Sequence, residues 1–261
     1  MKNRKEENML LNTLVDFLDG ELELAKFSRD YSNNGLQVEG KQEISKAVFS
    51  VDASLELFEE ASARNADFIF VHHGLSWGSE PRRFTGMTAR RLNCLFNAGI
   101  SLYAAHLPLD AHGVFGNNAQ LADMIGLKER ETFFEYSGVD IGFSGCLKDA
   151  PPCGAVSEFL GKKLAVTPML WGDAEKSVRK AAIVSGGGGL DCLLQAAERG
   201  CDLLITGEFD HTMYHPRKEL DINVIALGHY ASETVGPYAL MEHVQKTLAL
   251  ACEFIHIPTT L

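Results

Sequence analysis

Long hydrophobic runs, dense basic stretches and paired cysteines are all missing from this sequence. No apolar run approaches the ~20 residues of a membrane-spanning helix, which excludes an integral membrane protein of the helical type. No Lys/Arg-rich stretch occurs and the formal net charge is −11, which argues against nucleic acid as the main partner. The six cysteines never form Cys-x-x-Cys, so we expect reduced, mostly buried thiols and no thiolate metal site.

The N-terminal segment also lacks the apolar core of a signal peptide. Its basic start is followed by the acidic residues Asp16, Asp19, Glu21 and Glu23, and we therefore expect a cytoplasmic protein. The composition is otherwise that of an ordinary globular protein, with 46% hydrophobic and 23% charged residues. A chain of 261 residues is long enough for one large domain or two interwoven ones.

A weak internal duplication is present. A β-rich run, a helical stretch and a second β-rich run follow one another at residues 46–51, 55–64 and 67–71, and again at residues 180–185, 190–199 and 202–206. Strands that alternate with helices in this way predict an α/β fold with a largely parallel or mixed sheet in each half. We find no low-complexity tract or linker between independent domains, so the halves are expected to share one core or to pack tightly.

The approximate lobes are 1–128 and 129–261, within a single unit that covers 1–261. The middle segment, 129–170, is rich in glycine and proline. It is expected to be turn-rich and to carry the crossover between the lobes.

Histidines and carboxylates follow predicted strands at three places. They are His72 and His73 after residues 67–71, His106 and Asp110 after residues 101–105, and His229 and Glu233 after residues 224–227. Functional side chains in α/β sheets gather beyond the carboxyl ends of the strands. Because imidazole and carboxylate suit borderline divalent metals, the pattern predicts one metal site assembled from three distant segments.

Each of these groups also has a purely structural interpretation. The two adjacent histidines would then only bond nearby backbone, although Gly74 allows a bend that turns both towards one cleft. Asp110 would only cap a loop, which we expect to be extended because Pro108 disfavours a helix there. Glu233 would only complement the dipole of a helix that Ser232 caps. Convergence at strand ends favours the metal site.

Two further features lie beside strand ends. The run 186–189 consists of four glycines and either cradles an anion with its backbone N–H groups or lets a helix approach the sheet. Glu208 stands in the second repeat where the first has histidine, so it is a candidate general base or a partner of a metal ligand. His211 and His215 lie just beyond it and are either substrate contacts or solvent-exposed side chains.

Several spaced motifs resemble the GTP cyclohydrolase 1 type 2 family, also called NIF-three-like proteins. The resemblance spans nearly the whole chain and is carried by residues 34–40, the His72-His73 doublet, residues 105–110 with 116–118, residues 205–208 and residues 228–233. It implies two interwoven, internally duplicated α/β lobes with mixed sheets, the short form of the fold without an inserted domain. It also implies a toroidal homohexamer with two divalent metal ions per subunit.

Carried over by position, the resemblance assigns the metal ligands to His72, His73, Asp110, His229 and Glu233. Asp110 or Glu233 would bridge the ions, and His106 would lie beside the ligands together with Glu208. Imidazole with carboxylate suits zinc, iron, manganese and nickel alike, so the metal stays open. No catalytic residue is assigned.

The leading hypothesis is a dinuclear metal-dependent hydrolase that acts on a small substrate, with nucleotides as one class. Two-metal sites activate water and stabilise the charge that develops on attack. The alternative is a metal-binding hexameric scaffold or regulatory protein without catalysis. A third option is a redox role with bound iron.

Overall fold

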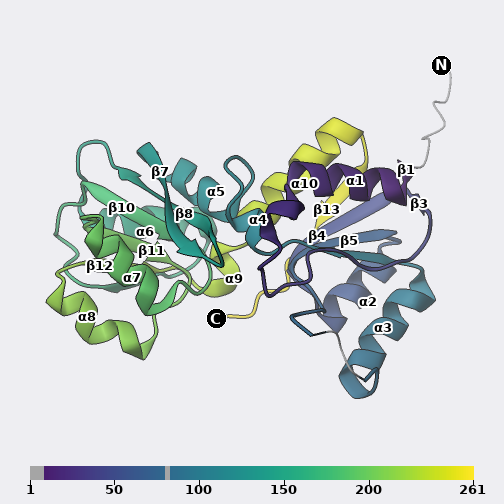
Figure 1. Ribbon diagram of the computed structural model, residues 1–261. Helices are drawn as coiled ribbons and strands as arrows, with labels where there is room; N and C mark the ends of the chain where they lie inside the picture. The colour runs from purple at the N-terminus through teal and green to yellow at the C-terminus, as the bar shows by residue number, and fades with distance from the viewer. Residues whose placement is uncertain (1–8, 80–82) are drawn as a thin grey trace. The chain divides into compact units, whose positions relative to one another are not determined.

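The computed structural model describes residues 9–79 and 83–261, which form two compact units, each with its own sheet (Figure 1). Unit 1 consists of the described residues up to Leu109 together with Pro237–Ile257. Unit 2 consists of Asp110–Gly236 and Pro258–Leu261. The chain therefore leaves unit 1, builds most of unit 2 and returns.

The sheet of unit 1 has five strands in the order β13-β4-β5-β6-β2. Their bounds are Ala251–Phe254, Lys46–Asp52, Phe68–His73, Ser101–Ala104 and Gly35–Val38. The first four are parallel, and β2 is antiparallel to β6 at the edge. Two short strands, β1 (Met9–Leu10) and β3 (Glu43–Ile44), form a separate antiparallel pair.

Helices cover both faces of this sheet. Helices α2 (Leu55–Ala63) and α3 (Gly86–Ala98) lie on one face, and α1 (Leu11–Glu21) lies beside α10 (Val235–Leu248) on the other (Figure 1). Alternate strand residues point to opposite faces, as a pleated strand requires. Ile69 and Leu102 thus pack with α2 and α3, whereas Phe70 and Tyr103 stack on the other face at 5.8 Å between ring centroids.

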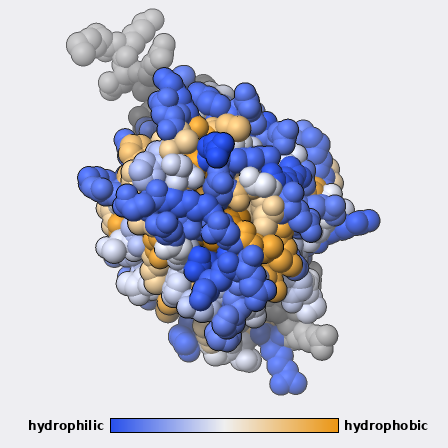
Figure 2. Space-filling model, turned by 90° about the vertical axis from the view of Figure 1, so that its left-hand side faces the viewer, coloured by the Kyte–Doolittle hydropathy of each residue, from blue (hydrophilic) through white to orange (hydrophobic). Residues whose placement is uncertain are grey.

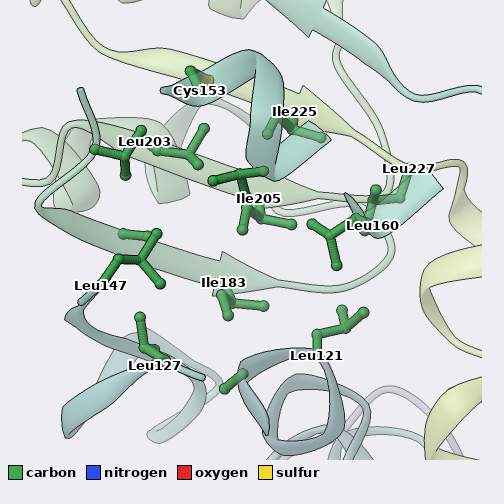
Figure 3. Close-up of a cluster of buried hydrophobic side chains, with 14 of the residues drawn as sticks. Leu121, Leu127, Leu147, Cys153, Leu160, Ile183, Leu203, Ile205, Ile225 and Leu227 are labelled. Atoms are coloured by element: carbon green, nitrogen blue, oxygen red, sulfur yellow. The ribbon is translucent and has the colours of Figure 1, made fainter. Parts of the chain in front are cut away.

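The sheet of unit 2 has six strands in the order β7-β8-β10-β11-β12-β9. Their bounds are Lys128–Tyr136, Val139–Cys146, Lys180–Val184, Leu203–Thr206, Asn223–Ala226 and Met169–Trp171. The central strands β10, β11 and β12 are parallel, and their neighbours on either side are antiparallel. Ile183, Ile205 and Ile225 occupy neighbouring strands and fill the buried core in Figure 3.

The remaining helical segments of the described chain are short or belong to unit 2. They are η1 (Leu24–Phe27), α4 (Leu107–Asp110), α5 (Asn117–Met124), α6 (Cys153–Leu164), α7 (Gly189–Glu198), η2 (His211–Met213), α8 (Tyr214–Glu219) and α9 (His229–Ser232). The predicted mixed α/β fold is confirmed. The middle segment, however, forms the β7-β8 hairpin and α6, so it is part of the unit 2 structure.

The internal duplication is visible in matching hydrogen bonds at the strand starts. Asp67 precedes β5, and its carboxylate accepts hydrogen bonds from the backbone N–H of Ser45 and Lys46 at 2.9 and 3.3 Å. Asp202 precedes β11 and accepts from Arg179 and Lys180 at 2.8 and 3.1 Å. Each aspartate thus joins the starts of two neighbouring parallel strands, β4 with β5 and β10 with β11.

The molecular surface in Figure 2 is largely hydrophilic, with a smaller hydrophobic area among the polar side chains. This agrees with a formal net charge of −11. Within residues 9–79 and 83–261, each helix is too short or too polar to cross a membrane.

Candidate metal centre

Unit 1 brings three histidines together at the carboxyl end of its parallel strands. His72 and His73 are the last residues of β5, and His106 follows β6, the next strand in the sheet. One ring nitrogen from each lies within 4.8 Å of the others, a grouping that can hold a metal ion. The strand runs through both residues of the doublet, and the two rings still lie 4.5 Å apart between centroids. Gly74 is therefore not needed to bend the chain between them.

A backbone or carboxylate oxygen lies at the Nδ1 atom of each of these histidines. The Nδ1 atoms of His72, His73 and His106 lie 3.0, 2.8 and 3.0 Å from Ala105 O, Asp52 Oδ1 and Asp30 Oδ1. Metal-binding histidines are commonly oriented in this way, because a partner at one ring nitrogen directs the other towards the ion. The three imidazoles are thus oriented as metal-binding histidines commonly are.

Asp30 is a buried carboxylate that holds this edge of the cluster in place. Besides His106, it accepts hydrogen bonds from the backbone N–H of Leu107 at 3.0 Å and from Asn34 at 2.8 Å. Burial alone would raise the pKa of Asp30, but the hydrogen bonds and the His106 charge outweigh it and lower the pKa below its ordinary value. Asp30 is therefore an anion that orients His106.

Trp77 forms a wall beside the histidines. Its indole lies edge-on to His106, with ring centroids 5.1 Å apart, and 5.9 Å from His73. The indole N–H donates to Gly74 O at 2.9 Å, which fixes the ring. The ring centroids of Tyr31 and Trp77 are 6.4 Å apart, and Tyr31 is 67% exposed.

Unit 2 contains the buried carboxylate of Asp110. This residue ends α4, a single helical turn in which the N–H of Leu109 bonds His106 O at 2.9 Å. The expected extended loop is thus wrong, because Pro108 lies in the first turn, where its missing N–H costs nothing. Asp110 Oδ1 accepts hydrogen bonds from Asn117 at 2.9 Å and Ser185 at 3.1 Å.

His229 and Glu233 come late in the sequence of unit 2, in and just after α9. His229 Nε2 is 3.2 Å from Glu233 Oε1, and its Nδ1 is 2.6 Å from Glu208 Oε1. A Glu233 oxygen also lies within 4.8 Å of an Asp110 oxygen. Asp110 and Glu233 are 5% and 3% exposed, so unit 2 holds two neighbouring buried carboxylates, and their charged forms are costly unless hydrogen bonds or positive charge compensate the burial.

His229 can supply the positive charge, because the surrounding carboxylates favour its protonated form. Its hydrogen bond to Glu233 and the charges of Glu233 and Glu208 outweigh burial and raise the pKa of His229 to about 9. In the absence of a metal ion, a proton on this imidazole balances the acids. A divalent cation carries more positive charge and would replace that proton when it binds.

Ser232 has a different role from the expected helix cap. It lies inside α9, and α10 begins later, at Val235. Its hydroxyl donates to His229 O at 2.9 Å and accepts from the N–H of Gly186 at 2.9 Å. Ser232 therefore ties the segment that carries His229 and Glu233 to the glycine run.

The glycine run owes its composition to close packing. A Cβ atom on Gly186 would stand 2.2 Å from Glu233 Oε1 and 3.2 Å from His229 Nε2, and its φ is +60°. Beside Gly187 lies a Glu208 oxygen, and beside Gly189 an Asp210 oxygen. These acids would repel a phosphate, so the geometry favours the packing interpretation over an anion cradle.

The other predicted residues fall as follows. Glu208 lies beside His229, as a partner of a metal ligand would. His106 lies in the histidine group of unit 1 and qualifies as a ligand by distance as well as by neighbourhood. His211 and His215 are exposed. The sequence interpretation missed Asp30 and Asp52. A usable signal existed for Asp52, which ends β4 opposite His73 in the neighbouring strand.

Fold and site together define a class: a duplicated α/β protein whose strand ends carry histidine and carboxylate clusters suited to divalent metals. Comparison with known proteins places it further. The sequence model of the Duf34/NIF3 (NGG1p interacting factor 3) family matches residues 9–260. The chain belongs to this family.

Curated relatives cover nearly the full chain. A protein of Archaeoglobus fulgidus named GTP cyclohydrolase 1 type 2 homolog is 48% identical over 97% of this chain and 100% of its own. A Pyrococcus horikoshii protein of the same name is 43% identical over 95% of this chain and 98% of its own. The resemblance predicted from the motifs is confirmed.

Solved structures of similar proteins have the same fold as this chain. A Thermus thermophilus protein of 39% identity superimposes with a TM-score of 0.86 over 97% of this chain and 100% of its own. Reduced HcgD from Methanocaldococcus jannaschii, 26% identical, gives a TM-score of 0.84 over 96% and 99%.

Proposed function

We propose that the chain is a dinuclear metal-dependent hydrolase that acts on a small substrate such as a nucleotide. The ligands would be His72, His73, Asp110, His229 and Glu233, with Asp110 or Glu233 as the bridge. The observation that carries the proposal is the oxygen at Nδ1 of each of the three ligand histidines, from a backbone carbonyl or a carboxylate. This is how proteins prepare imidazole for a metal.

The chemistry of the donors supports two ions in place of one. Three imidazoles and two buried carboxylates exceed what one four-coordinate ion needs. Asp110 is the first residue of unit 2, and Glu233 stands shortly before the chain returns to unit 1 at Pro237. Proposed ligands therefore lie close in sequence to both points where the chain passes from one unit to the other. Zinc, iron, manganese and nickel all suit this donor set.

Bound divalent ions would supply Lewis acidity and an activated water. The residues of the chain would position them: Asp52 orients His73, and Glu208 orients His229. Glu208 is half-exposed, with 54% of its side chain accessible, so it is placed to exchange protons with solvent or substrate. His106, held by Asp30, is a second such candidate.

Turnover measurements test the proposal. Protein loaded with Mn²⁺, Zn²⁺ or Fe²⁺ is assayed against GTP and a panel of phosphoesters, beside chelator-treated protein. We expect metal-dependent hydrolysis that Asp110→Ala and Glu233→Ala abolish while the variants stay folded. Fully loaded protein without turnover on any member of the panel would count against a hydrolase.

A metal-binding scaffold is the second candidate. We propose a toroidal homohexamer in either case. Phe84, Met87 and Phe96 lie just before or on α3 and are 63%, 56% and 58% exposed. Large apolar side chains that another subunit covers have such exposure in the isolated chain. In the scaffold case Asp110→Ala and Glu233→Ala lower the melting temperature, whereas the fully loaded protein turns over no member of the panel and no small molecule competes near the metals.

We also propose that the protein is cytoplasmic. All six cysteines are free thiols in the structure. Burial raises the pKa of the Cys192 thiol well above its ordinary value, so it stays protonated and unreactive. Free, buried thiols are typical of a reducing compartment. Fractionation of cells that express the tagged protein checks this assignment.

A further inference from the structure

A cavity of about 720 Å³ opens in unit 2 beside Glu208. Ligand sites usually measure about 300–1,000 Å³, so this space is large enough for an organic molecule. Its wall includes Met169 at the start of β9, Phe209, and Tyr230 in α9. The cavity therefore adjoins the turn that carries His229, one of the proposed metal ligands.

The charge of the lining is of one sign. Among the described residues that line the cavity, the charged side chains are Glu208 and Asp210, and basic side chains are missing. An anionic group such as a phosphate would meet these two carboxylates, of which Glu208 has a positive partner in His229, whereas the described lining residues offer none beside Asp210. A cationic or neutral group with N–H donors would find acceptors.

Both carboxylates are held in place before any ligand arrives. Asp210 is the N-cap of η2, and its Oδ1 atom accepts hydrogen bonds from the backbone N–H of Thr212 at 2.7 Å and from the Thr212 hydroxyl. Glu208 is held by His229 at 2.6 Å. Fixed acceptors cost little entropy when a ligand binds, which favours recognition.

The rest of the wall is mostly apolar. Phe209 stacks on Trp171 with ring centroids 4.5 Å apart and an interplanar angle of 15°, so it cannot easily turn away. Met169 is 56% exposed, although it lies in a strand of the sheet. Such an accessible apolar surface beside fixed acceptors is typical of a pocket for a ring or another compact organic group.

We propose that this cavity binds the organic part of the substrate, and that this part is a neutral or cationic group with N–H donors and not a phosphate. The assignment rests on the proposed hydrolase, because it is the Glu208–His229 contact that places the cavity next to the metal ligands. A substrate would thus be oriented by its organic part in unit 2.

Three indole probes of similar size and different charge test the assignment: tryptamine, a cation; tryptophol, neutral; and indole-3-acetate, an anion. Their dissociation constants are measured by calorimetry on metal-loaded and on chelator-treated protein. On chelator-treated protein we expect tryptamine to bind about tenfold more tightly than indole-3-acetate, with tryptophol between them. Equal binding of all three, or tighter binding of the anion, would overturn the proposal.

Two variants locate the binding. Asp210→Asn keeps the oxygen that bonds Thr212 and removes one charge, so the preference for tryptamine over indole-3-acetate should fall severalfold. Asp140→Asn is the matched control, because Asp140 also accepts from a threonine hydroxyl, that of Thr132 at 2.6 Å, and does not line the cavity. An equal effect of both variants would place the binding elsewhere.

Filling the cavity gives an independent test. Met169→Trp should weaken all three probes at least tenfold, whereas Leu220→Trp, at a position 44% exposed in unit 2, should leave them unchanged. Unaltered tryptamine binding in a folded Met169→Trp protein would refute the site. Probe binding to chelator-treated protein does not require turnover. A failure of the hydrolase assay would therefore leave the test of the cavity valid.

Discussion

Gly186 shows how one residue without a side chain shapes the candidate site. Its carbonyl oxygen accepts hydrogen bonds from the N–H groups of Gly207 and Glu208, both at 2.9 Å, and its own N–H bonds Ser232. Glu233 and His229 occupy the space that a Cβ atom would need. Glycine is therefore required here on two grounds, its positive φ and the close approach of two proposed ligands.

Gly186→Ala should displace Glu233 and weaken metal binding. We expect the affinity for Mn²⁺ or Zn²⁺ to fall at least tenfold, and the free energy of unfolding to fall by about 1–3 kcal/mol because of the left-handed backbone and the clash. Gly187→Ala is the control, since its Cβ would meet only Glu208, at 3.4 Å. Calorimetric titration and chemical denaturation distinguish the two. Similar results for both variants would contradict the close-packing explanation.

Asp52 contacts the imidazole of His73, one of the proposed ligands. It lies 2.8 Å from His73 Nδ1 and should fix the orientation of that imidazole. We expect Asp52→Asn to lower metal affinity about 10–100-fold with little change in the fold, as for other partners of metal-bound histidines. Asp19→Asn serves as the control, because Asp19 accepts a hydrogen bond from Tyr103 at 2.8 Å away from the histidines. Unchanged affinity in Asp52→Asn would remove His73 from the ligands.

At the scale of elements, the two halves repeat one device. An aspartate in front of a central strand bonds the backbone at the start of the neighbouring parallel strand, Asp67 in unit 1 and Asp202 in unit 2. Asp67 additionally accepts from the Ser45 hydroxyl at 2.6 Å and pairs with Lys41 at 3.1 Å. Parallel strands have no tight turn to set their register, so such local ties are valuable.

The pH dependence of stability should follow from Asp67. Burial alone would raise its pKa, but the bonds from Ser45 and the Lys41 charge outweigh it and lower the pKa below its ordinary value. A lowered folded-state pKa means that the carboxylate stabilises the fold above the unfolded value of about 3.9. That stabilisation disappears as the pH falls through the lower, folded value.

Asp67→Asn should therefore be less stable than the unmodified protein at pH 7, by about 1–3 kcal/mol. The difference should shrink as the pH falls below the unfolded value of about 3.9 and towards the lower, folded value. Asp202→Asn is the matched variant in unit 2. Its free energy of unfolding should fall less, because Asp202 makes the two backbone bonds without the hydroxyl and lysine contacts that Asp67 has. Denaturant unfolding at pH 7, 5 and 3 measures both. A constant difference across this range would show that the Asp67 charge does not contribute.

The β7-β8 hairpin is an element that the sequence interpretation did not identify. Its turn consists of Ser137 and Gly138, with φ of +54° and +86°, as two-residue hairpins of this handedness require. The Ser-Gly pair was a usable signal. The signal of the turn was hard to recognise because hydrophobic and polar residues do not alternate regularly along β7, where the neighbours Phe133 and Phe134 are both buried.

At the scale of the whole molecule, the proposed centre should couple metal binding to stability. Ions that bind the folded protein alone stabilise it by about 2.7 kcal/mol at a hundredfold excess over the dissociation constant. Removal of the ions with a chelator should therefore lower the melting temperature by about 5–10 °C, and added metal should restore it. Asp110→Ala protein should show no such response. A melting temperature independent of metal would argue against a metal site in the folded protein.

The proposed hexamer is tested at the same scale. Light scattering should give six times the chain mass of 28.6 kDa. Phe84→Glu with Met87→Glu should lower that mass, whereas Tyr136→Glu, at an exposed side chain on β7, should not. A monomer at micromolar concentration would exclude the assembly.

The sequence by itself determined the fold class, the duplicated order of strands and helices, the family and the residues that the candidate centre would use. These follow from local signals, namely hydrophobic periodicity, strand-end positions and spaced motifs such as the His72-His73 doublet. Only the tertiary structure decided that residues 237–257 return to unit 1, where β13 pairs with β4. It also decided that Asp52 and Asp30 orient histidines far away in the chain. Such pairings depend on which segments meet in space, and no local pattern encodes the partner of a parallel strand or of a buried carboxylate.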